Sequence, residues 1–312
     1  VLGGTGFIGH RLLQSLARQG HALRVLTRRR ERHRDLLVLP TLELVEANTH
    51  YVSELSQHFK DCDTVINLTG ILNPGSGPNS TFQAVHAELP AKIAEACRFN
   101  GIRRLLHMSA LGADREGPSE YLRSKAAGEE ALTAAAREGL AVTVFRPSVV
   151  FGPEDDFFNR FAALVKVAPV LPLAMPEARF APVYVGDVAT AFVLALEDRG
   201  THGQVYELCG PGVYTLRELV EYVARKLGRR RWIVGLGEGG ARLQARVLAR
   251  MPGQLLTPDN LQSMSVDSVC TDNGLESLGI HPTSLEAVAP AYLARTGRES
   301  YYQSLRVLAG RS

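Results

Sequence analysis

The chain has 312 residues, of which 45% are hydrophobic and 21% are charged. These values are typical of a folded globular protein and exclude a disordered, coiled-coil or collagen-like chain. The formal net charge of +3 is too balanced for a protein that coats nucleic acid, and no apolar run has the ~20 residues of a transmembrane helix.

The first 150 residues alternate short β-rich segments with amphipathic segments. Strands are predicted at 24–27, 42–45, 64–68, 104–108 and 142–145, and helices at 8–19, 51–59, 82–98 and 120–137. The strands are short apolar runs, which suits strands buried on both faces of a parallel sheet. Strand–helix alternation predicts an α/β fold with a Rossmann-type, doubly wound parallel sheet.

The chain begins with Val1-Leu2, directly before a glycine-rich turn. A strand that feeds such a turn normally has about five residues. We therefore expect the first strand to be truncated at its N-terminal end.

The glycine-rich turn reads Gly3-Gly4-Thr5-Gly6-Phe7-Ile8-Gly9 and precedes a predicted helix. In a dinucleotide-binding turn the first glycine permits the tight turn, the second admits the pyrophosphate, and the third allows close helix–strand packing. The strand–turn–helix context favours this interpretation over a ligand-free turn. The residues expected to bind the cofactor here are Gly3, Thr5, Gly6, Phe7, Ile8 and Gly9.

The second predicted strand ends at Thr27 and is followed by Arg28 and Arg29. A carboxylate at this point would bind the adenosine ribose hydroxyls, whereas arginine can clamp a 2′-phosphate. We therefore expect Arg28 and Arg29 to favour NADP(H) over NAD(H). The alternative, a solvated helix start, is expected for Arg30, Arg32 and Arg34.

The pattern becomes less regular after residue 152, where five prolines interrupt the chain before residue 183. We predict an NADP(H)-binding domain at 1–152 and a smaller, mainly helical lobe at 153–312 that binds substrate or a partner. A predicted strand at 205–208 makes this lobe interwoven with the first domain, to which it contributes at least one strand.

The four cysteines, Cys62, Cys97, Cys209 and Cys270, form no CxxC pair and no zinc-like spacing. We therefore predict no metal site. Scattered cysteines favour a reducing compartment, and hence the cytoplasm, with each thiol serving as a small buried side chain.

The glycine spacing, together with Tyr121-Leu122-Arg123-Ser124-Lys125, resembles the extended and atypical short-chain dehydrogenases/reductases. The segment Arg146–Pro153 is similar to the loop that lines the nicotinamide side in that superfamily, which implies cofactor contacts by Pro147 and Val150. Asn67-Leu68-Thr69-Gly70 resembles its cofactor-supporting segment and implies contacts by Thr69 and Gly70.

Three further segments are similar to bacterial relatives of the nucleotide-binding accessory subunit of respiratory complex I, alpha subcomplex subunit nine. They are Tyr121–Glu129, Phe151–Phe161 and the tail around Leu278–Thr283. That family holds NADPH and is linked to complex I assembly and quinone biology. The resemblance implies a respiratory-complex or membrane-peripheral partner, and a peripheral inner-membrane location as an alternative to the free cytoplasm. The balanced net charge predicts no nucleic-acid partner.

Tyr121 and Lys125 are four residues apart on a predicted helix and therefore share a face. A nearby ammonium group lowers the pKa of a phenol, and such a tyrosine can act as acid or base while a hydride moves. The alternative is a surface pair without chemistry. The resemblance implies that Lys125 also holds the nicotinamide ribose.

The resemblance also implies a catalytic hydroxyl after the strand at 104–108, where Ser109 is followed by Ala110. Many extended members have two adjacent hydroxyl residues there, with the second catalytic, so Ala110 puts turnover in question. Asn48 falls where relatives often place an Asp near the adenine and could hydrogen-bond the base. His86 stands where many relatives have Asn, and we assign it no role.

Two functions follow. The first is an NADP(H)-dependent oxidoreductase that acts on a hydroxyl or carbonyl of a quinone-related or lipid-like molecule. The alternative is a non-catalytic NADPH-binding accessory or assembly factor of complex I or of quinone biosynthesis. The resemblance leaves open a homodimer formed through a helix bundle.

Overall fold

The computed structural model describes residues 1–250 and 254–293. Its main sheet is parallel and contains β1 (Leu23–Thr27), β2 (Leu42–Glu46), β3 (Thr64–Asn67), β4 (Arg104–Met108), β5 (Ala141–Pro147) and β10 (Val205–Leu208). Leu2 bridges Leu26 on one side and Asn67 on the other, so it joins β1 to β3. The resulting order, β2-β1-Leu2-β3-β4-β5-β10, confirms the predicted Rossmann-type sheet.

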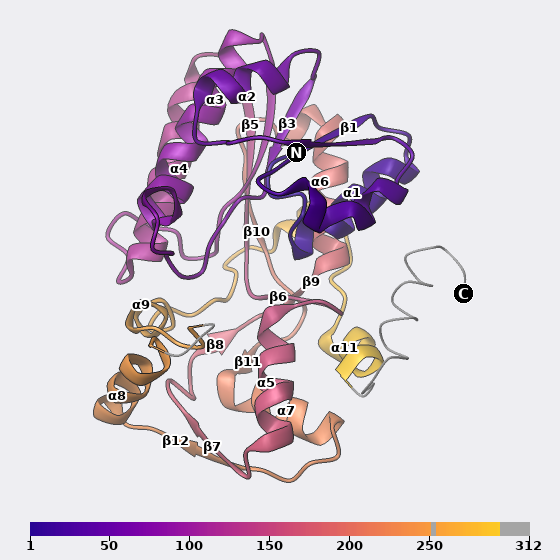
Figure 1. Ribbon diagram of the computed structural model, residues 1–312. Coiled ribbons are helices and arrows are strands. Elements are labelled where there is room, and N and C mark those ends of the chain that lie inside the picture. The colour runs from indigo at the N-terminus through magenta and orange to yellow at the C-terminus, as the bar shows by residue number, and fades with distance from the viewer. Residues whose placement is uncertain (251–253, 294–312) are drawn as a thin grey trace.

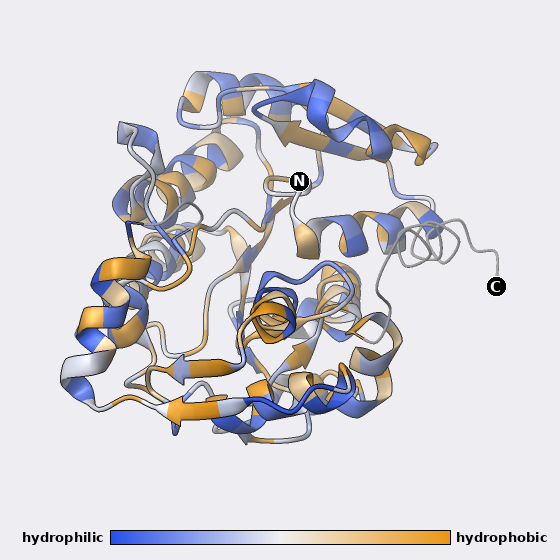
Figure 2. Cartoon of the chain, turned by 60° about the horizontal axis from the view of Figure 1, so that its bottom comes forward, coloured by the Kyte–Doolittle hydropathy of each residue, from blue (hydrophilic) through white to orange (hydrophobic). Residues whose placement is uncertain are grey.

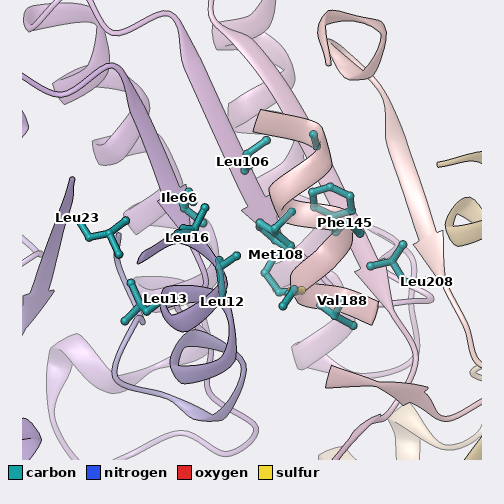
Figure 3. Packing of buried hydrophobic residues seen from close by; sticks show 14 of the residues in the cluster. Leu12, Leu13, Leu16, Leu23, Ile66, Leu106, Met108, Phe145, Val188 and Leu208 are labelled. Carbon is teal, nitrogen blue, oxygen red and sulfur yellow. The ribbon is translucent and has the colours of Figure 1, made fainter. Parts of the chain in front are cut away.

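Helices cover both faces of this sheet (Figure 1). One face carries α2 (Val52–Phe59), α3 (Leu89–Phe99) and α4 (Glu120–Arg137), and the other carries α1 (Phe7–Arg18) and α6 (Val185–Glu197). α1 buries Leu12, Leu13 and Leu16 because these positions share one face of the helix. They belong to the same core as Met108 of β4 and Phe145 of β5 (Figure 3).

The second half of the chain builds a smaller, mostly helical lobe. Its elements are β6 (Val150–Phe151), α5 (Asp156–Val167), β7 (Val170–Leu173), β8 (Arg179–Phe180), β9 (Val183–Tyr184), β11 (Tyr214–Thr215), α7 (Leu216–Lys226), β12 (Trp232–Gly235), α8 (Glu238–Leu248), α9 (Pro258–Ser263) and α11 (Leu285–Leu293). A second core joins α5, α7 and α11 through Phe158, Leu219 and Leu285. These helices carry both hydrophobic and hydrophilic residues (Figure 2), as expected for helices with one buried face.

This second half returns to the main sheet three times. β10 pairs in parallel with β5, α6 packs beside α1, and α10 (Gly274–Ser277) packs against β10 with Leu275 in the core of the main sheet. The phenyl rings of Phe145 and Phe192 lie 4.3 Å apart, so strand and returning helix share one core. The division at residue 152 stays a prediction.

Two expectations differ from the structure. The segment 82–98 is not one helix but a π-helix, Gln83–Glu88, that leads into α3. The expectation of four free thiols was wrong for Cys209 and Cys270, which form a disulfide across 61 residues of sequence. The fold brings the end of β10 against the segment that follows α9, and spacing along the chain does not show this approach. Cys62 and Cys97 are free, and burial raises the pKa of Cys97 to about 12.

Candidate functional site

Gly3, Gly6 and Gly9, the three glycines of the dinucleotide-binding spacing, differ in their steric surroundings. Gly3 has φ +72°, where other residues are strained. A Cβ at Gly9 would lie 2.4 Å from the main-chain oxygen of Gly4, so only glycine allows α1 to approach the turn this closely. Gly6 is exposed, and the nearest atom to a Cβ there would be the Gly3 oxygen at 3.4 Å. The turn therefore has an open side beside the start of α1.

The N-terminus of α1 fits an anionic ligand. Within the described residues it has no side-chain cap, and its first turn contains no acidic residue. Its first N–H groups are therefore left for a ligand, as in sites that bind a pyrophosphate. Thr5, Phe7 and Ile8 are partly exposed beside this helix end, where the sequence predicted cofactor contacts.

Arg28 and Arg29 leave the end of β1 with exposed side chains. In residues 1–250 and 254–293 neither guanidinium is hydrogen-bonded or ion-paired to the protein. Arg34 instead pairs with Glu31 in the helical segment that follows. Asn48 is exposed, and its Oδ1 accepts a hydrogen bond from His50 N at 3.2 Å, which leaves its Nδ2 for another partner.

α4 presents Tyr121 and Lys125 toward the sheet. Ser119 caps the helix by accepting a hydrogen bond from Leu122 N at 3.2 Å. Lys125 is buried, and its Nζ donates to the main-chain oxygen of Met108 at 3.2 Å. The Tyr121 ring packs edge-on against Phe82, with 5.9 Å between ring centroids.

Burial shifts the pKa values of both Tyr121 and Lys125. It raises the pKa of Tyr121 to about 12 and lowers the pKa of Lys125 to about 8, with Glu129 opposing the latter shift. The expected lowering of the Tyr121 pKa by Lys125 is therefore not seen, because burial raises that pKa. A lysine with a pKa of about 8 is still mostly protonated near pH 7, so burial of the Tyr121 phenol outweighs any stabilisation of its phenolate by the ammonium group.

The end of β4 carries an unsatisfied hydroxyl. Ser109 is buried, and its Oγ has no hydrogen-bond partner among the described residues. Side chains alternate along a strand, so Ser109 shares a face with His107, whereas Leu106 and Met108 point to the core shown in Figure 3. A buried polar atom without a partner is costly, and it fits a site that awaits a ligand oxygen.

The loop after β3 lies close to Lys125. A Cβ at Gly70 would be 3.3 Å from Lys125 Nζ, and Thr69 N donates to Asn67 Oδ1 at 3.0 Å. Asn67 Nδ2 in turn lies 3.1 Å from His107 Nδ1. The structure therefore brings the predicted residues Thr69 and Gly70 to the same sheet edge as Lys125.

Pro147 and Val150 flank this edge from β5 and β6. The main-chain oxygen of Pro147 accepts a hydrogen bond from Leu111 N at 3.0 Å, and Val150 pairs with Val183 and is partly exposed. No group of His, Cys, Asp and Glu side chains in the described ranges is arranged to hold a metal ion.

His86 is a site residue to which the sequence pattern assigned no role. Its Nε2 accepts a hydrogen bond from Ile71 N at 3.0 Å, so Nδ1 carries the proton and donates to Ser124 Oγ at 3.0 Å. Burial lowers the pKa of His86 to about 2 and keeps the ring neutral. Its ring meets that of Tyr121 edge-on at 5.4 Å, which ties the β3 loop to α4. The π-helix that carries His86 could not be predicted from the local sequence.

A cavity of about 270 Å³ lies along the outer side of α4, between Gln83, Arg115 and Arg123. None of the predicted cofactor or catalytic residues lines it. The cofactor site predicted at the glycine turn is therefore separate from this cavity.

Comparison with known proteins identifies the family of the chain. Residues 1–209 match the model of the NAD dependent epimerase/dehydratase family. The chain is 32% identical to NADH dehydrogenase [ubiquinone] 1 alpha subcomplex subunit 9, mitochondrial, of Arabidopsis thaliana, over 94% of this chain and 76% of that protein. It is 33% identical to ceramide reductase of Caulobacter vibrioides, over 62% of this chain and 59% of that protein.

Solved structures confirm the fold. An NADPH-dependent quinone oxidoreductase of Escherichia coli, complexed with NADPH, superposes with a TM-score of 0.73 at 17% identity and covers 97% of this chain and 98% of its own. A dTDP-glucose 4,6-dehydratase of Streptomyces venezuelae with NAD bound superposes with a TM-score of 0.74 at 19% identity, and the match covers 100% of this chain and 98% of its own. The sequence match, the sheet order and the glycine turn agree: this chain belongs to the NAD dependent epimerase/dehydratase family.

Proposed function

We propose that the protein is an NADPH-dependent oxidoreductase that reduces a carbonyl, or oxidises the matching hydroxyl, of a quinone-related or lipid-like molecule. The observation that carries the proposal is the buried hydroxyl of Ser109, which has no hydrogen-bond partner among the described residues and lies one residue beyond the Met108 oxygen to which Lys125 donates. If this position bound no ligand, we would expect its hydroxyl to be hydrogen-bonded within the protein or replaced by an apolar side chain.

The bound cofactor supplies a hydride. Tyr121 Oη gives the proton that the substrate oxygen needs when the carbonyl carbon is reduced, and takes it back in the reverse direction. Ser109 Oγ donates a hydrogen bond to the same oxygen. His86 and Phe82 hold the Tyr121 ring from two sides. Lys125 would hold the nicotinamide ribose, and its ammonium group would favour the phenolate as the proton leaves Tyr121.

The preference for NADPH rests on Arg28 and Arg29. Both side chains are exposed at the end of β1, with no partner in the described part of the protein. Their guanidinium groups suit a 2′-phosphate, which they would bind through charge-assisted hydrogen bonds.

The substrate class draws on names of similar proteins, a ceramide reductase and a quinone oxidoreductase. Turnover is tested by following reduced-nicotinamide absorbance with a short-chain quinone and with a long-chain ketone. Tyr121→Phe should lower kcat about 100-fold or more, whereas Tyr51→Phe, at an exposed tyrosine, should not change it. Equal turnover by Tyr121→Phe would contradict the proposal.

A second candidate is an NADPH-holding accessory subunit of a respiratory complex at the inner membrane. It is favoured by relatives that match 94% or more of this chain and are named as subunits of NADH dehydrogenase or NADH-ubiquinone oxidoreductase. Ala110, which follows Ser109, also fits this candidate. No helix in the two described ranges combines the length and hydrophobicity of a membrane span. Tight NADPH binding without any turnover would favour it, and light scattering would show whether the protein forms the homodimer that the resemblance leaves open.

A further inference from the structure

The first turn of α4 is capped by a residue from the other half of the chain. Asp259 of α9 accepts hydrogen bonds from Glu120 N at 2.7 Å and from Tyr121 N at 3.2 Å, one with each carboxylate oxygen. Ser119 satisfies the next N–H, that of Leu122. The first N–H groups of an α-helix have no partner within the helix, so the two residues together complete the cap. The carboxylate also lies at the positive end of the helix dipole.

α9 connects the two segments that flank the Tyr121–Lys125 pair. The hydroxyls of Ser263 and Ser119 are 2.8 Å apart, which fixes α9 to the start of α4 a second time. On the other side, Asn260 Nδ2 lies 3.4 Å from the main-chain oxygen of Leu72, in the loop after β3. α9 therefore spans from that loop to the N-terminus of α4.

Asp259 is held on a well-defined turn. Thr257 Oγ1 accepts a hydrogen bond from Asn260 N at 3.2 Å, and Asn260 Oδ1 accepts one from Thr257 N at 3.0 Å. This reciprocal capping box fixes the start of α9, and Pro258 restricts its backbone further. The carboxylate is therefore preorganised for the two N–H groups of α4.

We propose that Asp259 is a positioning residue: it fixes the first turn of α4, and with it Tyr121, so that the proton donor is in place only when α9 is docked. The inference rests on the proposed function, in which Tyr121 donates the proton. Tyr121 is the second residue of its helix, where the backbone would otherwise fray. A misplacement of about 1 Å in a reacting group can lower turnover roughly 100-fold.

The test is a graded series at Asp259. Aspartate offers two acceptor oxygens, Asp259→Asn offers one, and Asp259→Ala offers none. Hydrogen exchange of the Glu120–Leu122 amides should become roughly 3- to 30-fold faster in Asp259→Ala, the range expected for loss of a helix cap. The exchange rate of the same amides in Asp259→Asn should lie between those of wild type and Asp259→Ala. The matched control is Asp267→Asn, at an exposed carboxylate that lies 3.6 Å from Arg179 and should leave the exchange unchanged.

Two further readouts separate positioning from simple stabilisation. The kcat should fall in the same order while the Kd for NADPH stays constant, because the glycine turn is not altered. Independently of turnover, absorbance titration against Tyr121→Phe should show the pKa of Tyr121 falling from about 12 toward 10 as water reaches the ring. Unchanged exchange, or faster exchange with unchanged kcat and unchanged Tyr121 titration, would overturn the proposal. If the wild-type protein turns over no substrate, the proposed function fails, and the exchange and titration still decide whether Asp259 places Tyr121.

Discussion

Gly128 of α4 lies directly against the main-chain oxygen of His86, where an added Cβ would come to 2.0 Å. This contact sets the distance between α4 and the π-helix. It therefore sets the distance between the Tyr121 ring and the His86 ring that packs against it. Helix packing and the candidate site thus depend on the same glycine.

Gly128→Ala should therefore destabilise the protein, although alanine is the better helix former. The two helices must separate, and overpacking of this kind lowers the free energy of unfolding by about 1–3 kcal/mol. Denaturant unfolding measures the change. Gly239→Ala in α8 is the control, since a Cβ there would meet no atom within 4 Å, and it should be neutral or stabilising. A gain in stability in both variants would show that the contact with His86 is not tight.

Ser109→Ala should raise the stability of the free protein by about 1 kcal/mol, because a buried hydroxyl without a partner is unfavourable. It should also lower turnover. Ser148→Ala is the matched control, since the Ser148 hydroxyl is buried and donates to the Ser268 oxygen at 2.7 Å. The free energy of unfolding of Ser148→Ala should be about 1 kcal/mol lower than that of wild type. If Ser109→Ala loses as much as Ser148→Ala, Ser109 has a partner in the free protein.

Lys125 should make stability rise with pH. Its pKa is about 8 in the folded state, against an ordinary value of 10.5 in an unfolded chain, so between these pH values the unfolded chain binds more protons. The destabilisation by the buried ammonium group is full below pH 8, on the order of 3 kcal/mol, and fades as pH rises toward 10.5.

The measurement is the unfolding free energy of wild type minus that of Lys125→Met, between pH 7.5 and pH 9.5. This difference should increase with pH, and Cys97 and Tyr121, which titrate in both proteins, cancel from it. Lys92→Met, near the protein surface, is the control, and the difference between its unfolding free energy and that of wild type should not change with pH. A flat difference for Lys125→Met as well would mean that the amine is solvated.

Reduction of the Cys209–Cys270 disulfide should lower the melting temperature. The bond closes a 61-residue stretch, for which the loop-entropy estimate is about 4 kcal/mol. The paired variant Cys209→Ala/Cys270→Ala should melt at one temperature with or without reductant, while Cys62→Ala should still respond. Alkylation of all four thiols in the native, unreduced protein would contradict the pairing.

The features that the sequence predicted best are local ones. The glycine turn and the Tyr121–Lys125 spacing each lie within a few residues, and the bounds of β4 and α4 agree with the prediction to the residue. Contacts between distant segments were not predictable from one sequence. The disulfide, the Asp259 cap and the His86–Ile71 hydrogen bond depend on how loops meet after folding.

In the proposed function, the glycine turn at residues 3–9 binds NADPH together with Arg28 and Arg29, which follow β1. The most direct measurement is the Kd for NADPH and for NADH, by titration calorimetry, of wild type and of Arg28→Ala/Arg29→Ala. The wild type should prefer NADPH, and the double variant should lose roughly 10- to 100-fold in affinity for NADPH, from lost charge-assisted hydrogen bonds, with little change for NADH. Arg32→Ala/Arg34→Ala should behave as wild type. Equal affinity of the wild type for both nucleotides, or no binding of either, would contradict the account.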